Sequence, residues 1–225
     1  MPGEASDRAA RSRQIIGRRM LASKLSAPHF YVQRDVDVTR LTATRTSSTG
    51  MPSVTDYLVA ASVFALIREP AFNAVWEGES LVRRETINLG LAVETESGLV
   101  APALLDCAAM SLVDISAARR DIVARAGAGQ LRPAELTEGT FTLSNLGTFG
   151  VTSFTAIINP PQVAILATGA LRETLALRGT QVISTQFITV TLSADHRAID
   201  GADAARFLAR FAEGLSTLSE SPLGE

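Results

Sequence analysis

Cysteine, lysine and histidine are scarce in this chain of 225 residues, and each shortage narrows the range of functions. Cys107 is the only cysteine, so no disulfide can form within the chain, and its apolar neighbours indicate a packing role. Lys24 is the only lysine, the arginines are scattered, and the net charge is −2. Because nucleic-acid binding depends on clustered cations, we expect no nucleic-acid partner.

Long apolar runs are also absent. No stretch reaches the ~18 uninterrupted apolar residues of a membrane span, and the N-terminus has no apolar signal segment. We therefore expect a cytoplasmic protein without a membrane partner. The sequence contains no metal-ligand cluster, no P-loop and no GxGxxG motif, so we also expect no metal site.

The composition, 46% hydrophobic and 20% charged, is that of a globular protein with enough apolar residues for a core. We expect one folded domain over residues 13–219. A flexible polar N-terminus at 1–12 would precede it, and a tail at 220–225 would follow.

Helical and strand patterns alternate irregularly along the chain. Two capping boxes, Ser53 with Asp56 and Ser111 with Asp114, each precede a helical pattern. We predict helices over 13–25 and 57–67, from 112 and after 201, a loop at 45–52, and strands over 29–38, 140–144, 163–170 and 188–192. The last helix is expected to bury Ala205, Leu208, Phe211, Ala212, Leu215 and Leu218. Hairpins mixed with crossovers predict an α+β fold, a two-layer sandwich with a mixed sheet.

The stretch TLSADHRAIDG, residues 191–201, carries the first candidate for chemistry. His196 directly follows an apolar strand, so its backbone should be held rigidly. An imidazole with a pKa of ~6.5 can accept a proton from a thiol or a hydroxyl near neutral pH, and Asp200 could fix its orientation. The alternatives are that His196 is an ordinary loop or core histidine, and that Asp200, with Asp203, only caps the last helix.

Ser144 is the second candidate, at the end of the strand over 140–144 and beside the glycine-bearing loop NLGTFG. A hydroxyl that donates to a developing oxyanion typically contributes ~10² to 10³ in rate. The alternative is a serine that closes a turn at the end of a strand.

Five segments, in order, resemble the catalytic domain of the dihydrolipoamide acyltransferases, the E2 components of 2-oxoacid dehydrogenase complexes. They are RQIIGRRMLASKLSAPHFYVQRDVDV, SVTDYLVAA, INLGLAVETESGLVAPAL, GTFTLSNLGTFGVTSFTAIINPPQVAILATGA and DHRAIDG. They cover nearly the whole chain from about residue 13. The HxxxDG motif alone is shared with chloramphenicol acetyltransferases and condensation domains, but the neighbouring SNLG and IINPP segments make the resemblance specific.

The resemblance implies a chloramphenicol-acetyltransferase-like fold, coenzyme A or acyl-CoA as a substrate, and homotrimers with active sites between subunits. It implies that His196 is the general base for an acceptor thiol or hydroxyl, that Ser144 hydrogen-bonds the tetrahedral oxyanion, and that Asp200 supports the geometry. Ser144 and His196 would then come from neighbouring chains. His29 matches a family position too, and we interpret it as structural.

Two departures from the family pattern bear on the acceptor. Family members usually carry lipoyl domains upstream, whereas this sequence reaches the catalytic segments soon after Met1, so we expect no lipoyl group on this chain. Thr55 stands where the family usually has Asn, and the Lys that commonly follows is absent. These departures favour a stand-alone enzyme that transfers an acyl group from CoA to a small-molecule acceptor.

Two alternatives remain open. The first is an E2 catalytic core that transfers acyl groups between dihydrolipoyl and CoA, with its trimers able to build a larger cage. The second is a non-catalytic scaffold subunit. Retention of Ser144, His196 and Asp200 argues against the scaffold.

Overall fold

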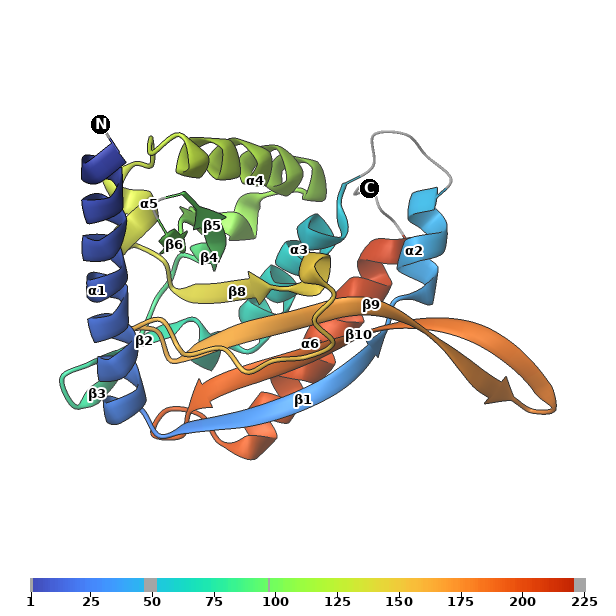
Figure 1. Ribbon diagram of the computed structural model, residues 1–225. Helices are drawn as coiled ribbons and strands as arrows, with labels where there is room; N and C mark the ends of the chain where they lie inside the picture. The colour runs from blue at the N-terminus through green and yellow to red at the C-terminus, as the bar shows by residue number, and fades with distance from the viewer. Residues whose placement is uncertain (1, 47–51, 97, 221–225) are drawn as a thin grey trace.

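A mixed six-stranded sheet forms the centre of the protein (Figure 1). The computed structural model describes residues 2–46, 52–96 and 98–220. The strand order is β1 (His29–Asp37), β10 (Gln181–Asp195), β9 (Ala164–Arg178), β8 (Phe141–Asn145), β4 (Leu89–Leu91) and β7 (Ala103–Leu104). β8 runs parallel to β9 and to β4, and the other neighbours are antiparallel. The predicted α+β fold with a mixed sheet is confirmed.

Helices cover one face of this sheet. α3 (Val54–Arg68) and α6 (Gly201–Glu220) pack against each other and lie behind the sheet in Figure 1. The other helices are α1 (Pro2–Ser26), α2 (Thr39–Thr46), α4 (Leu112–Gly127) and α5 (Pro133–Thr137), with 3-10 turns at Pro70–Phe72, Cys107–Ala109 and Gly147–Phe149. Two small hairpins pair β2 (Ala74–Glu77) with β3 (Ser80–Arg83), and β5 (Val93–Thr95) with β6 (Gly98–Val100).

The core lies between the sheet and the helices α3 and α6. The ring of Phe207, on α6, lies 4.5 Å from that of Phe72 and 5.4 Å from that of Phe141, measured between centroids. All three rings are fully buried, so they remove large apolar surfaces from water and fix the rotation of α6 about its axis. Ala205, which we expected to be buried, is exposed for this reason.

Both predicted capping boxes are confirmed. In each box the serine hydroxyl accepts a hydrogen bond from the aspartate N–H, and the carboxylate accepts one from the serine N–H. Asp56 is fully buried and also binds Ser116 and Arg119 of α4, which ties α3 to α4.

The start of the first predicted helix and the start of the predicted loop at 45–52 were wrong, and α2 was not predicted. The helix expected from Arg13 begins at Pro2, so residues 2–12, expected to be flexible, are helical. That segment is rich in alanine and arginine, which favour helices, and extending a helix is easier than nucleating one. α2 reaches into the loop expected at 45–52, of which residues 47–51 lie outside the described residues, as does the expected tail after 220.

β9 and β10 are longer than predicted because they continue past the sheet as a two-stranded ribbon (Figure 1). β1 pairs with β10 only from Phe187 onward, so the part of β10 before that residue has β9 as its partner strand. Leu175, Leu177 and Val182 share one face of the ribbon and are 73%, 76% and 63% exposed. Polar residues interrupt the apolar pattern throughout the ribbon, which is why the sequence predicted shorter strands.

A buried carboxylate joins α4 to α5. Glu135 is 1% exposed and accepts two hydrogen bonds from Arg125, each at 2.7 Å, and one from Arg132 Nη2 at 2.6 Å. The hydrogen bonds from Arg125 lower the pKa of Glu135 from its ordinary 4.5 to about 2, against the opposing effect of burial. The ionised carboxylate of Glu135 is therefore much more stable in the folded protein than in the unfolded chain.

This shift predicts a specific acid sensitivity. Because the pKa of Glu135 is depressed on folding, its contribution to stability is complete above pH 4.5 and is lost as the pH falls from there toward 2. We expect Glu135→Gln to lower the free energy of unfolding by about 1.5–3 kcal/mol at pH 7, and the difference from the wild type to vanish near pH 2. Urea unfolding at a series of pH values measures both quantities.

Asp121→Asn is the matched control, because Asp121 contacts the same Arg125 but is 63% exposed. An exposed ion pair contributes less than about 1 kcal/mol. An equal loss in both variants would contradict the importance of burial at Glu135.

Candidate active site

His196 stands at the point where β10 ends and is held there by backbone and side-chain contacts. Its N–H donates to the carbonyl of Pro28 at 3.0 Å. The buried carboxylate of Asp195 binds Arg197 on the other side, with 2.6 Å between Oδ2 and Nη2. The ring of Phe30 lies against the imidazole, with centroids 4.5 Å apart. The predicted rigid placement of His196 agrees with these contacts.

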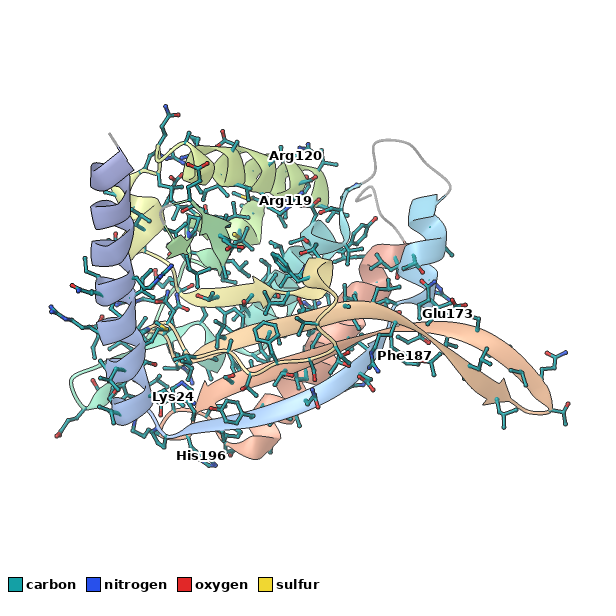
Figure 2. All side chains as sticks on the ribbon, in the orientation of Figure 1. Lys24, Arg119, Arg120, Glu173, Phe187 and His196 are labelled. Carbon is teal, nitrogen blue, oxygen red and sulfur yellow. The ribbon has the colours of Figure 1, made fainter. Side chains whose placement is uncertain are left out.

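The imidazole of His196 is nevertheless exposed (Figure 2). Within the part of the chain that the structure describes, neither ring nitrogen has a hydrogen-bond partner. A ring nitrogen of His196 is therefore available to accept a proton from a molecule outside this chain.

Asp200 caps α6. Its Oδ1 accepts from the N–H of Asp203 at 2.8 Å, and its carbonyl accepts from the N–H of Ala204 at 3.0 Å. The hydrogen bond from Asp203 holds the pKa of Asp200 below its ordinary value. Asp200 therefore does cap the helix, as one reading of the sequence predicted. Among the described contacts none joins Asp200 to His196, and the role of Asp200 in the chemistry stays a prediction.

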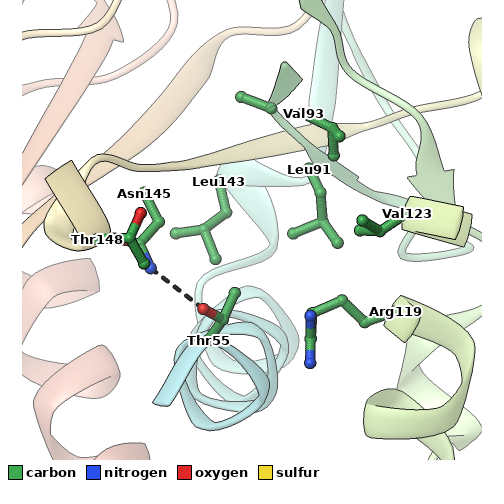
Figure 3. Close-up of a pocket in the computed structure, with 9 residues that line it drawn as sticks. Thr55, Leu91, Val93, Arg119, Val123, Leu143, Asn145 and Thr148 are labelled. Atoms are coloured by element: carbon green, nitrogen blue, oxygen red, sulfur yellow. Dashed lines mark hydrogen bonds between the residues drawn. The ribbon is translucent and has the colours of Figure 1, made fainter. Parts of the chain in front are cut away.

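Ser144 lies on β8 with its side chain away from the helices. Leu143 and Asn145, on either side of it, point to the helix face and line a cavity there (Figure 3). Since side chains alternate along a strand, Ser144 faces the opposite side of the sheet. Ser144 pairs with Ala167 on β9, which pairs with Thr191 on β10.

The face that carries Ser144 is lined by polar groups. Thr142 donates its hydroxyl to Gln162 Oε1 at 2.6 Å, and Gln33 Nε2 donates to Thr191 Oγ1 at 3.2 Å. The segment 151–163, which contains Gln162, crosses in front of the sheet in Figure 1. This face is therefore suited to polar contacts near Ser144.

One chain does not bring Ser144 and His196 together. Ser144 shares a row of the sheet with Thr191, two strands away, and His196 comes five residues after Thr191. With ~3.3 Å per residue along a strand and ~4.8 Å between strands, the two residues are roughly 15–20 Å apart.

The loop after Ser144 is fixed by contacts that the sequence analysis did not anticipate. Asn145 accepts from the N–H of Gly147 at 2.8 Å and donates to Thr55 Oγ1, at the start of α3, at 3.2 Å (Figure 3). A Cβ on Gly147 would meet the carbonyl oxygen of Gly169 at 2.6 Å. A Cβ on Gly169 would meet that of Thr152 at 1.9 Å. Both glycines thus allow the loop to pack directly on β9.

The cavity beside this loop has a volume of about 150 Å³. Its walls are mostly aliphatic, and Arg119 of α4 contributes the one charge among its lining residues (Figure 3). Val123 lies in this wall and is 36% exposed. The cavity is on the helix side of β8, behind Ser144.

The thiol of Cys107 is made unreactive by its surroundings. Cys107 is fully buried, its thiol donates to the carbonyl of Leu104 at 3.1 Å, and burial raises its pKa to about 11. Among the described residues, no group of three His, Cys, Asp or Glu side chains could hold a metal ion. No helix in the described ranges is long and apolar enough to cross a membrane.

The sequence matches a family model over residues 3–222, that of the catalytic domain of the 2-oxoacid dehydrogenases acyltransferase family. The chain belongs to this family. Its fold agrees with solved members. A structure of Azotobacter vinelandii dihydrolipoamide acetyltransferase is 31% identical, with a TM-score of 0.88 over 95% of this chain and 91% of that one. A cubic core of a pyruvate dehydrogenase complex gives 30% identity and a TM-score of 0.88, over the same shares.

Curated relatives are longer than this chain. The acetyltransferase component of pyruvate dehydrogenase from Schizosaccharomyces pombe is 37% identical over 99% of this chain and 47% of its own length. The mouse pyruvate dehydrogenase protein X component is 35% identical over 92% of this chain and 43% of its own. The chain thus spans about half the length of these relatives. A chloramphenicol acetyltransferase shares the fold, with a TM-score of 0.59 at 14% identity over 84% of this chain and 89% of its own.

The close packing at Gly169 generates a prediction. We expect Gly169→Ala to lower the free energy of unfolding by about 1–3 kcal/mol, because the added methyl group must displace the backbone at Thr152. Gly17→Ala is the control, since a Cβ there meets nothing within 4 Å and alanine favours a helix. Thermal unfolding of the two variants measures the difference, and an unchanged Gly169→Ala variant would contradict the packing.

The helix cap at Asp200 generates a further stability prediction. Asparagine caps helices as well as aspartate does, so Asp200→Asn should keep the wild-type stability while Asp200→Ala loses about 1 kcal/mol. Urea unfolding distinguishes the two. Equal losses in both variants would show that the carboxylate charge, and not the cap, stabilises this region.

Proposed function

We propose that this chain is the catalytic core of an E2 acyltransferase, which transfers an acyl group between a dihydrolipoyl thiol and CoA within a 2-oxoacid dehydrogenase complex. The family membership and the names of the relatives support this reading. They do not support the stand-alone enzyme with a small-molecule acceptor that the sequence departures favoured. The observation that carries the proposal is the exposed imidazole of His196 on a rigid strand end, with no hydrogen bond to its ring nitrogens from the residues that the structure describes.

The proposed mechanism uses His196 as the base. A ring nitrogen accepts the proton of the incoming thiol, whose sulfur attacks the thioester carbonyl and forms a tetrahedral oxyanion. The hydroxyl of Ser144 donates a hydrogen bond to that oxyanion. When the intermediate collapses, the old C–S bond breaks and the departing thiolate takes the proton back from the imidazolium, so the enzyme is regenerated.

Spacing along the chain supports the choice of residues. The Azotobacter vinelandii structure is described in terms of a serine, a histidine and an asparagine in the catalytic mechanism of that enzyme. The number of residues between its serine and its histidine equals the number between Ser144 and His196. The number between its histidine and its asparagine equals the number between His196 and Asp200. This chain has an aspartate where that enzyme has an asparagine, which is consistent with a role for Asp200 that either side chain can fill.

We further propose that the site forms between subunits of a homotrimer. Ser144 and His196 are too far apart in one chain to act on one carbonyl. A neighbouring copy placed against the polar face would supply the missing partner. A solved relative described as a cubic core supports a symmetric assembly of this kind, because cubic symmetry contains threefold axes.

A scaffold role is the competing proposal, and the mouse X component is the observation that favours it, because it is a relative not named as an acetyltransferase. Retention of Ser144 and His196 supports the enzyme. An assay of acetyl transfer from acetyl-CoA to dihydrolipoamide, measured by the release of free CoA, distinguishes the E2 enzyme from the scaffold. Turnover only with alcohols would favour the stand-alone enzyme, and no turnover with any acceptor would favour the scaffold.

Two single variants test the mechanism. His196→Ala should lower kcat by ~10² or more, because it removes the base that takes the thiol proton in this mechanism. Ser144→Ala should lower kcat by ~10² to 10³ with little effect on the KM for CoA, since its contact forms only in the transition state. Wild-type rates in the His196 variant would remove the mechanism.

Mixing these two inactive variants tests the shared site. In randomly mixed trimers, about a quarter of the interfaces would combine an intact Ser144 with an intact His196 from the neighbour, so about a quarter of the activity should return. Co-expressed, separately tagged chains provide the mixture. No recovery in verified mixed trimers would place both residues in a site within one chain.

A further inference from the structure

The imidazole of His29 is fixed by hydrogen bonds at both of its ring nitrogens, although it lies outside the proposed chemistry. The N–H of Ile158 donates to its Nε2 at 3.1 Å, so this nitrogen carries a lone pair and no proton. Nδ1 then carries the proton and donates to the carbonyl of Ala27 at 2.8 Å. Both ring nitrogens are used within the chain, in contrast to those of His196.

Ile158 connects His29 to the region around Ser144 through the segment to which Ile158 belongs. Ile158 lies in the segment 151–163, and its carbonyl also accepts from the buried hydroxyl of Ser23 on α1 at 2.7 Å. Farther along the same segment, Gln162 binds Thr142, two residues before Ser144 on β8. The segment therefore connects the ring of His29 with the strand that carries Ser144.

The backbone around His29 contacts the turn that contains His196. Pro28 accepts the N–H of His196, and His29 pairs with Asp195 across β1 and β10. Phe30 places its ring against the imidazole of His196. Residues 28–30 thus hold the turn of His196, and His29 uses its side chain to fix the segment 151–163 beside that turn.

We propose that His29 is a positioning residue for acyl transfer, acting through its hydrogen bond to Ile158. This role rests on the proposed function, because it concerns the placement of His196 and of the polar face in that reaction. Displacement of a reacting group by about 1 Å can cost ~10² in rate. Loss of the Ile158 bond therefore lowers kcat and leaves the KM for CoA unchanged.

Two substitutions test the proposal, because each keeps only one of the two hydrogen bonds. A glutamine amide reaches the position of Nε2 and can accept from Ile158, whereas an asparagine amide reaches that of Nδ1 and can bond only Ala27. We expect His29→Gln to keep kcat within about fivefold and His29→Asn to lower it by ~10². The KM for CoA should stay within about twofold in both. Acetyl transfer to dihydrolipoamide by the assembled protein measures these values.

A second readout comes from the composition. The chain has two histidines, so either variant leaves His196 as the only imidazole. We expect the NMR resonances of its ring to match the wild type in His29→Gln and to shift in His29→Asn. A purely structural role for His29 would leave the resonances of His196 the same in both folded variants.

Ser111→Ala is the control for general destabilisation, because it uncaps α4 and leaves the contacts of His29 in place. It should lower the unfolding midpoint without lowering kcat. A wild-type kcat in His29→Asn, or activity lost in both His29 variants in proportion to their unfolding midpoints, would overturn the proposal. An inactive wild type would count against the proposed function instead, and the resonances of His196 would still decide the role of His29.

Discussion

β10 is hydrogen-bonded to β1 along one edge and to β9 along the other, and this double pairing determines where every candidate group lies. A slip of one residue in either register would turn the side chains of β10 to the opposite face of the sheet. In the observed register Val190 and Leu192 enter the core, while Thr191 faces the polar side. The strand then ends beside the start of β1, where His196 is exposed.

Local features of the sequence were sufficient to predict the four longest helices and the four longest strands. The capping boxes at Ser53 and Ser111 are short-range hydrogen-bond patterns, and a helix follows each of them as predicted. The rotation of α6 about its axis depends on packing partners that are distant in the sequence. Phe207 is buried because it meets Phe72 and Phe141, and no pattern within the helix contains that information.

The candidate site was predicted in part for the same reason. Ser144 and His196 could be identified because each lies in a short motif beside a strand. The contacts that hold them are long-range, as with Asn145 to Thr55 and His29 to Ile158, and follow from strand register and loop packing. Thr55 appeared in the sequence only as a departure from the family pattern. In the structure its hydroxyl accepts a hydrogen bond from the side-chain amide of Asn145.

The ribbon formed by β9 and β10 projects well beyond the rest of the sheet. A bulge lies between Ile188 and Val190, and beyond it the ribbon extends by roughly 25 Å at ~3.3 Å per residue. A rotation of about 5° at the bulge moves the tip by roughly 2 Å over that length. Val182, one of the exposed aliphatic residues of the ribbon, lies on β10, and His196 directly follows the same strand on the opposite side of this bulge.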